Sequence, residues 1–137
     1  MTNTATTDAA TTNNAAASHH AINWFEIPTT DLERAATFYE KLFDRKIRRE
    51  HFGEPMAIFM SSKEGVGGTL VQRADQAPSD SGVLIYLNAD GVLDAAVTRV
   101  PKIGGSVLVP VTVIPGGFGR YAVLRDTEGN RIALHEH

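Results

Sequence analysis

The apolar residues of the first half of the chain alternate between a strand period and a helix period. Residues 22–27 alternate and stop at Pro28, which predicts a first strand. Residues 32–43 place Leu, Ala, Phe and Tyr mainly on one helical face, so an amphipathic helix is expected there, with Thr30 or Asp31 as its N-cap. Three short strands are expected next, at 46–50, 56–60 and 66–72.

The same order of elements begins again after the polar stretch 73–81. A strand is expected at 82–89, then a helix at 92–103 that ends at Gly104 and Gly105. The last three strands are expected at 106–113, with Pro110 at an edge or bulge, at 121–125 and at 131–136, the last two joined by the turn DTEGN. The chain therefore predicts an α+β fold built from two tandem strand–helix–three-strand (βαβββ) units, residues 21–73 and 82–137.

Composition narrows the class of protein. The chain has 137 residues with 13 Lys and Arg against 16 Asp and Glu, a net charge of −3 that argues against a nucleic-acid or anionic-membrane partner. It has no cysteine, which excludes disulfides and thiolate chemistry. Residues 1–20 contain no Leu, Ile, Val or aromatic residue and no secretory signal, so we interpret them as a disordered tail before one domain, residues 21–137, of a cytoplasmic protein.

Two motifs resemble a known family. DLERAATFYEKLF at the first helix and DTEGNRIALHE at the last hairpin, within duplicated βαβββ units, are similar to the vicinal oxygen chelate superfamily, which contains glyoxalase I, bleomycin-resistance proteins and extradiol dioxygenases. The chain is most similar to small bacterial glyoxalase-like proteins related to lactoylglutathione lyase. The resemblance implies a glyoxalase-like fold, a cup of curved antiparallel sheet, and a homodimer. It also implies that the glycine-rich segment 114–119 is mobile beside the cup.

The resemblance also implies where a divalent metal would be held, on the first and last strand of each unit. Counting from the helix motifs and the repeat offset, these positions fall on Trp24, Thr69, Leu84 and Ala133. An indole, a methyl group and an isobutyl group offer no lone pair to a metal, and a threonine hydroxyl alone is weak. We therefore expect no metal cofactor and no metal ligands at the family positions.

Strand alternation predicts which side chains line the cup instead. Glu26 shares a face with Trp24, and His135 with Ala133; both are candidate catalytic residues, because a carboxylate and an imidazole can transfer protons. Glu26 has a competing structural interpretation, an ion pair with an arginine such as Arg125. The candidate ligand-binding residues are Trp24, Met56, Ile58, Leu84, Tyr86, Tyr121 and Arg125.

Three functions remain open from the sequence. The first is a metal-independent protein that binds a small organic molecule in a dimeric cup, with or without catalysis. The second is a metal-dependent lyase, isomerase or dioxygenase of glyoxalase type with displaced ligands, for which Glu26, His135 and His51 are candidates. The third is a non-enzymatic dimeric interaction module whose cup is filled by its own side chains.

Overall fold

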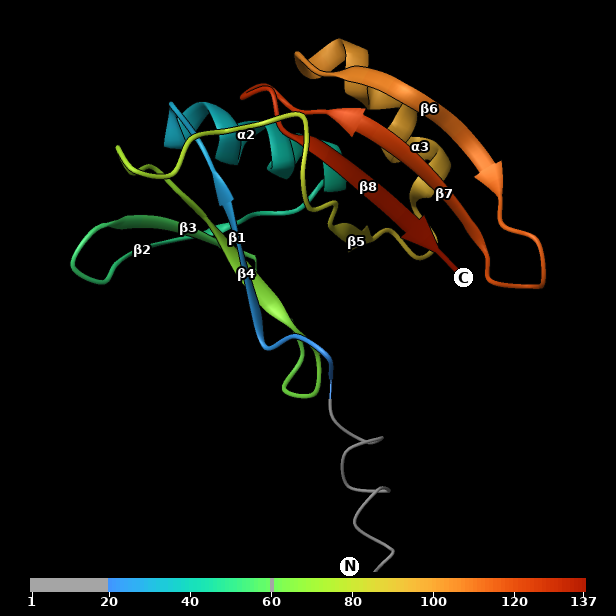
Figure 1. The fold of residues 1–137 in the computed structure, drawn as a ribbon, viewed down its shortest axis with the longest axis horizontal. Coiled ribbons are helices and arrows are strands. Elements are labelled where there is room, and N and C mark those ends of the chain that lie inside the picture. The colour runs from blue at the N-terminus through green and yellow to red at the C-terminus, as the bar shows by residue number, and fades with distance from the viewer. Residues whose placement is uncertain (1–19, 60) are drawn as a thin grey trace, which may run out of the picture. The chain divides into compact units, whose positions relative to one another are not determined.

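The computed structural model describes residues 20–59 and 61–137 (Figure 1). The tail expected at residues 1–20 lies outside the described residues except for His20. These residues form two compact units, one of residues 20–25 with 61–67 and one of residues 26–59 with 68–137. In the smaller unit, Nε2 of His20 donates to the Glu64 carbonyl oxygen at 2.7 Å. In the described part of the chain, no helix has the length and apolarity to cross a membrane.

The first sheet contains four strands in the order β1-β4-β3-β2. Both β2–β3 and β3–β4 are antiparallel pairs. Each predicted strand is present, with ends shifted by one or two residues. The strands are β1 (Trp24–Pro28), β2 (Arg48–His51), β3 (Pro55–Phe59) and β4 (Gly67–Val71).

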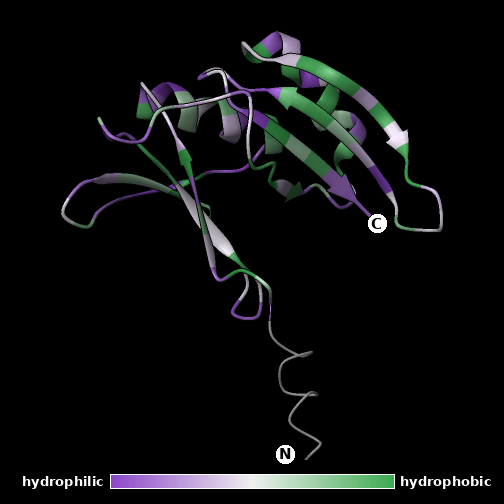
Figure 2. Cartoon of the chain, in the orientation of Figure 1, coloured by the Kyte–Doolittle hydropathy of each residue, from purple (hydrophilic) through white to green (hydrophobic). Residues whose placement is uncertain are grey.

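Helix α2 (Leu32–Phe43) has the bounds that the periodicity predicts. The Asp31 side chain caps it by accepting a hydrogen bond from the backbone N–H of Arg34 at 3.1 Å, which selects Asp31 over Thr30 as the N-cap. The ribbon of this helix changes repeatedly between hydrophilic and hydrophobic colours in Figure 2, as expected of an amphipathic helix. Its buried face consists of Leu32, Ala35, Ala36, Phe38, Tyr39 and Leu42.

The second sheet has the strand order β5-β8-β7-β6, with β6, β7 and β8 side by side in Figure 1. Its edge strand β6 has two register irregularities around Pro110, as the position of that proline predicts. The β7–β8 hairpin is antiparallel, and Gly129 in its turn has φ of 93°, a conformation that favours glycine. The strands are β5 (Tyr86–Asn88), β6 (Ser106–Val113), β7 (Arg120–Arg125) and β8 (Arg131–Glu136).

Two details of the second half differ from the sequence expectation. The expected helix 92–103 is an α-helix, α3 (Leu93–Arg99), followed by a 3₁₀ turn, η1 (Val100–Ile103), because Pro101 has no N–H to continue the α-helical pattern. The strand expected at 82–89 is shorter, and β5 pairs with β8 in parallel rather than antiparallel. Since β6, β7 and β8 run in alternating directions after α3, β8 returns beside β5 in the same direction.

The first helix is joined to the second sheet through buried polar contacts. The fully buried Tyr39 hydroxyl donates to a carboxylate oxygen of Asp126 at 2.6 Å, and burial together with the charge of Asp126 raises the pKa of this phenol. The Tyr39 ring packs edge-on against Phe38 and Phe59, which belong to the same core. Asp126 lies in the β7–β8 turn, so this turn fixes the position of α2.

The neighbouring Glu128 of the same turn caps α2 from outside the helix. Its Oε1 accepts from the backbone N–H groups of Thr30 and Asp31 at 2.9 and 3.0 Å, and Arg34 donates to both carboxylate oxygens at 2.8 and 2.9 Å. Burial opposes ionisation of this carboxyl, but the hydrogen bonds from Arg34 and the two backbone groups outweigh it and lower its pKa to about 2. The turn motif therefore has a structural role.

Candidate functional site

One face of the second sheet carries the aromatic and ionisable side chains that the sequence proposes as a site. In the strand register, Tyr86 lies opposite Ala133, and Tyr121 lies opposite His135. Val123 is the other cross-strand neighbour of Ala133. Residues that are opposite one another project to the same side of a sheet, so these five side chains share one face, as alternation predicts. We call this face the aromatic face.

The two tyrosines meet above Ala133. Because β8 lies between β5 and β7, Tyr86 and Tyr121 approach one another across β8, with ring centroids 6.3 Å apart and a tilt of 58°. Ala133 beneath them has no exposed surface, whereas 54% of Tyr86 is exposed. The aromatic face therefore presents an accessible phenol ring beside a closed apolar floor, which suits the apolar part of a small molecule.

His135 connects this face to the glycine-rich segment 114–119. Its Nε2 lies 2.7 Å from the carbonyl oxygen of Phe118. A carbonyl oxygen only accepts, so Nε2 carries the proton, and in the neutral ring Nδ1 is the atom left to accept one. The ring of His137 packs edge-on at 4.7 Å. In the neutral His135 ring, Nδ1 is therefore free to accept a proton, while Nε2 binds the glycine-rich segment 114–119 through the carbonyl oxygen of Phe118.

Glu26 lies in an ion-pair network. Arg73 donates from Nη1 to Glu26 Oε1 at 2.7 Å and also pairs with Glu54. The hydrogen bond from Arg73 is the main reason that the pKa of Glu26 is lowered. The arginine partner named in the sequence interpretation is wrong, because Arg125 contacts Asp80 at 3.3 Å instead.

Four of the other predicted ligand-binding residues lie outside the aromatic face. Met56 and Ile58 are half-buried on β3 of the first sheet, where Ile58 is opposite Thr69. Trp24 on β1 is 48% exposed. Leu84 is half-buried and lies two residues before β5. Of the proposed set, the structure thus brings Tyr86, Tyr121, Arg125 and His135 to one side of the second sheet, and their role as ligand contacts stays a prediction.

The four positions implied for a metal do not fit one. The fully buried Thr69 hydroxyl has one proton and two backbone acceptors within reach, the carbonyl oxygens of Ala57 and Leu70 at 3.1 and 2.9 Å, so this side chain has a structural role and is at most a lone, weak metal ligand. Ala133 offers a methyl group beneath two phenol rings, and Trp24 and Leu84 have no donor atoms for a metal. Among the described residues, no three His, Cys, Asp or Glu side chains are grouped to hold an ion. His51, a candidate displaced ligand, is the exposed last residue of β2.

An open groove of about 170 Å³ runs along the junction of β1, β8 and the segment that precedes β5. Its charged lining side chains are Glu26 and Arg131, and its hydroxyl groups come from two serines of the connecting segment. Arg131 is two residues from Ala133 on β8, so its side chain is on the same side of the sheet as the aromatic face. The groove is lined by Glu26, Ile27, Pro28, Ala77, Ser79, Ser81, Val83, Ile85, Asn130, Arg131 and Ile132.

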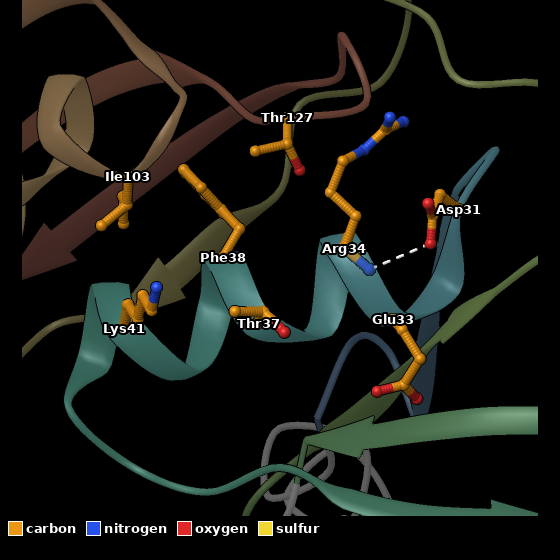
Figure 3. Close-up of a pocket in the computed structure, with 8 residues that line it drawn as sticks. All are labelled: Asp31, Glu33, Arg34, Thr37, Phe38, Lys41, Ile103 and Thr127. Atoms are coloured by element: carbon orange, nitrogen blue, oxygen red, sulfur yellow. Dashed lines mark hydrogen bonds between the residues drawn. The ribbon is translucent and has the colours of Figure 1, made fainter.

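A second hollow, of about 360 Å³, lies along helix α2 and is drawn in Figure 3. None of the residues predicted to form the site lines it. Three of its four charged side chains have structural partners: Asp31 caps the helix, Arg34 binds Glu128, and Glu33 binds Arg49; the fourth is Lys41. We therefore place the candidate site on the aromatic face and its groove.

Sequence reasoning missed two residues of this region. Arg131 continues the alternation of Ala133 and His135, so the strand period contained the signal that places it on this face. Arg73 lies in a stretch without periodicity, and only the fold brings it to Glu26 across a separation of 47 residues.

Comparison with known proteins agrees with this fold. The model of the Glyoxalase/Bleomycin resistance protein/Dioxygenase superfamily matches residues 21–134. A glyoxylase-like domain-containing protein of Didymella fabae is 33% identical over 121 residues, covering 85% of this chain and 93% of that protein. The chain belongs to the Glyoxalase/Bleomycin resistance protein/Dioxygenase superfamily.

Solved structures show the same fold at low identity. A glyoxalase/bleomycin resistance protein from Albidiferax ferrireducens is 19% identical to this chain, with a TM-score of 0.70. The match covers 86% of this chain and 100% of the Albidiferax protein. The fosfomycin resistance protein FosX from Listeria monocytogenes is 15% identical with a TM-score of 0.62, covering 87% and 94%. At these identities the likeness establishes the fold, and function has to be argued from the site.

Proposed function

We propose that this protein binds a small organic molecule on the aromatic face and its groove, as a homodimer and without the metal site of its superfamily. The observation that supports this most strongly is the exposed Tyr86 ring beside Tyr121, above a methyl group at the implied metal position. Such a surface favours apolar and aromatic groups over a hydrated ion. The open groove of about 170 Å³ is unlike a face filled by its own side chains.

Within this proposal, His135 and Glu26 have different tasks. Glu26 is ionised and a weak base at neutral pH, because its hydrogen bond to Arg73 lowers its pKa. We therefore assign Glu26 to orienting a polar group of the ligand. Proton transfer, where the bound molecule undergoes it, is assigned to Nδ1 of His135, since Nε2 is engaged by Phe118. Arg125, which lies opposite Arg131, is a further proposed contact on this face, whereas Trp24, Met56, Ile58 and Leu84 stay predicted contacts outside it.

The test is a ligand screen with a matched pair of variants. Binding of a library of small aromatic and aliphatic molecules is measured by ligand-observed NMR on the wild-type protein, on Tyr86→Ala and on Phe52→Ala. Both rings are exposed, at 54% and 64%, so neither truncation should unfold the protein. We expect Tyr86→Ala to lose the hits and Phe52→Ala to keep them. Equal binding by the three proteins would refute a site at the aromatic face.

Two further measurements test the remaining parts. Elemental analysis after dialysis is expected to find no stoichiometric zinc, nickel or iron, and finding one would overturn the metal-independent function. Light scattering during gel filtration is expected to give twice the mass of one chain, 14.8 kDa. A monomer at every concentration would remove the homodimer from the proposal.

A further inference from the structure

Arg131 is the only arginine in residues 20–59 and 61–137 whose guanidinium has no ion pair, hydrogen bond or ring contact. Six of the other arginines form salt bridges: Arg34, Arg48, Arg49, Arg73, Arg120 and Arg125. Arg45 lies over the ring of Phe43, and Arg99 donates to the carbonyl oxygen of Leu42. A guanidinium with five donors directed at solvent from the wall of a groove is available to a ligand.

The position of Arg131 in the sheet places a second arginine beside it. Arg131 lies directly opposite Arg125 in the β7–β8 register. Like charges opposite one another on a sheet repel, and such a pair is relieved by a group of opposite charge. Asp80 relieves one side of the pair by contacting Arg125 at 3.3 Å. Arg131 has no such partner, because Glu26, the carboxylate that lines the groove with it, is already paired with Arg73.

We propose that Arg131 is an oxyanion subsite, and that the molecule bound at the aromatic face carries a carboxylate. This inference rests on the proposed function and specifies its ligand. The planar guanidinium matches a carboxylate through two parallel hydrogen bonds. Arg131 precedes Ala133 by two residues on one strand, which separates the charged subsite from the tyrosines above Ala133 by about 7 Å.

This separation defines the ligand class. The carboxylate is joined by a spacer of two or three carbon atoms to an aromatic or branched apolar group, which lies on Tyr86. The hydroxyl groups of Ser79 and Ser81, which line the groove beside Arg131, can donate to the free carboxylate lone pairs. A ligand of this class places its charge where the protein has an unpaired cation and its apolar part where the protein has an exposed ring.

The experiment compares 3-phenylpropanoate with its neutral amide, 3-phenylpropanamide, by calorimetric titration of the full chain. The wild-type protein is expected to bind the carboxylate about tenfold more tightly than the amide. In Arg131→Gln this preference should disappear while the affinity for the amide stays unchanged, which also shows that the variant is folded. The control Arg45→Gln removes the same charge from an exposed position outside the site and should keep the preference.

The outcomes separate this inference from the proposed function. If the wild-type protein binds both probes with equal affinity, or if Arg45→Gln loses the preference as Arg131→Gln does, the subsite is overturned and the aromatic face remains a binding site. If neither probe binds, the subsite is overturned as well. The proposed function is then decided by the library screen on Tyr86→Ala, which does not depend on a carboxylate.

Discussion

The carboxylate of Glu128 offers the sharpest test of how the turn DTEGN holds helix α2. The side chain has no exposed surface and accepts hydrogen bonds from two backbone N–H groups at the start of the helix and from Arg34. Glu128→Gln removes the charge and keeps the shape of the side chain. The predicted effect is a loss of stability that depends on pH, because the ionised form is the one that the site binds.

The magnitude follows from the lowered pKa. A fall from the ordinary 4.5 to about 2 corresponds to roughly 3 kcal/mol of folding free energy at neutral pH. Half of the Arg34 side chain is exposed, so solvent screens part of this interaction, and we expect a measured loss of about 2 kcal/mol. A depressed carboxyl pKa stabilises the fold above the unfolded pKa. This contribution is therefore complete at neutral pH and is lost as the pH falls from 4.5 through about 2.

The assay is urea unfolding of wild-type and Glu128→Gln proteins at pH 7 and pH 3. The difference in unfolding free energy should be about 2 kcal/mol at the higher pH and roughly half of that at the lower. Glu64→Gln, a glutamate in the corresponding β3–β4 turn, is the control and should change stability by less than about 0.5 kcal/mol. If the unfolding free energies of wild type and Glu128→Gln differ by the same amount at both pH values, the stabilisation does not come from the ionised carboxylate and the reasoning is refuted.

Three further predictions follow from single contacts. Tyr39→Phe removes the hydroxyl that donates to buried Asp126 at 2.6 Å, and thermal unfolding should show a loss of about 1–2 kcal/mol; an unchanged melting temperature would contradict this. Gly119→Ala places a methyl group 2.0 Å from a carbonyl oxygen of β8 at φ of 88°, and chemical denaturation should show a loss of about 3 kcal/mol. Gly117→Ala, also at positive φ but with nothing within 4 Å, should lose only about 1 kcal/mol, and equal losses would rule out the close contact. Arg131→Gln removes the repulsion with the arginine opposite and should stabilise the ligand-free protein by about 0.5 kcal/mol in the same assay, whereas a destabilised variant would show that no repulsion exists.

The sequence predicts those parts of the fold that depend on short-range patterns. The bounds of α2, the edge position of Pro110 and the β7–β8 hairpin all follow from periodicity and turn residues within a few positions. Pro101 carried the signal for the 3₁₀ turn, since it cannot donate within a helix, and the sequence interpretation did not use it.

The candidate site was only partly predictable from the sequence, because some of its contacts join residues that are far apart in the chain. Alternation placed Tyr86, Tyr121 and His135 on one face, which the register confirms. It could not identify Arg73 as the partner of Glu26, because an ion pair across 47 residues depends on how the strands and loops assemble. Nor does a local pattern show that Glu128 would cap a helix 94 residues earlier in the chain.

The contact between Tyr39 and Asp126 limits how far the two similar halves of the chain can behave as separate bodies. The hydroxyl is fully buried and its acceptor comes from the far end of the sequence, so detaching the last hairpin leaves a phenol without a partner inside the first half. Neither half can then keep its fold at low cost while the other is open. Although the chain repeats one unit twice, we therefore expect its two halves to unfold together in a single cooperative step.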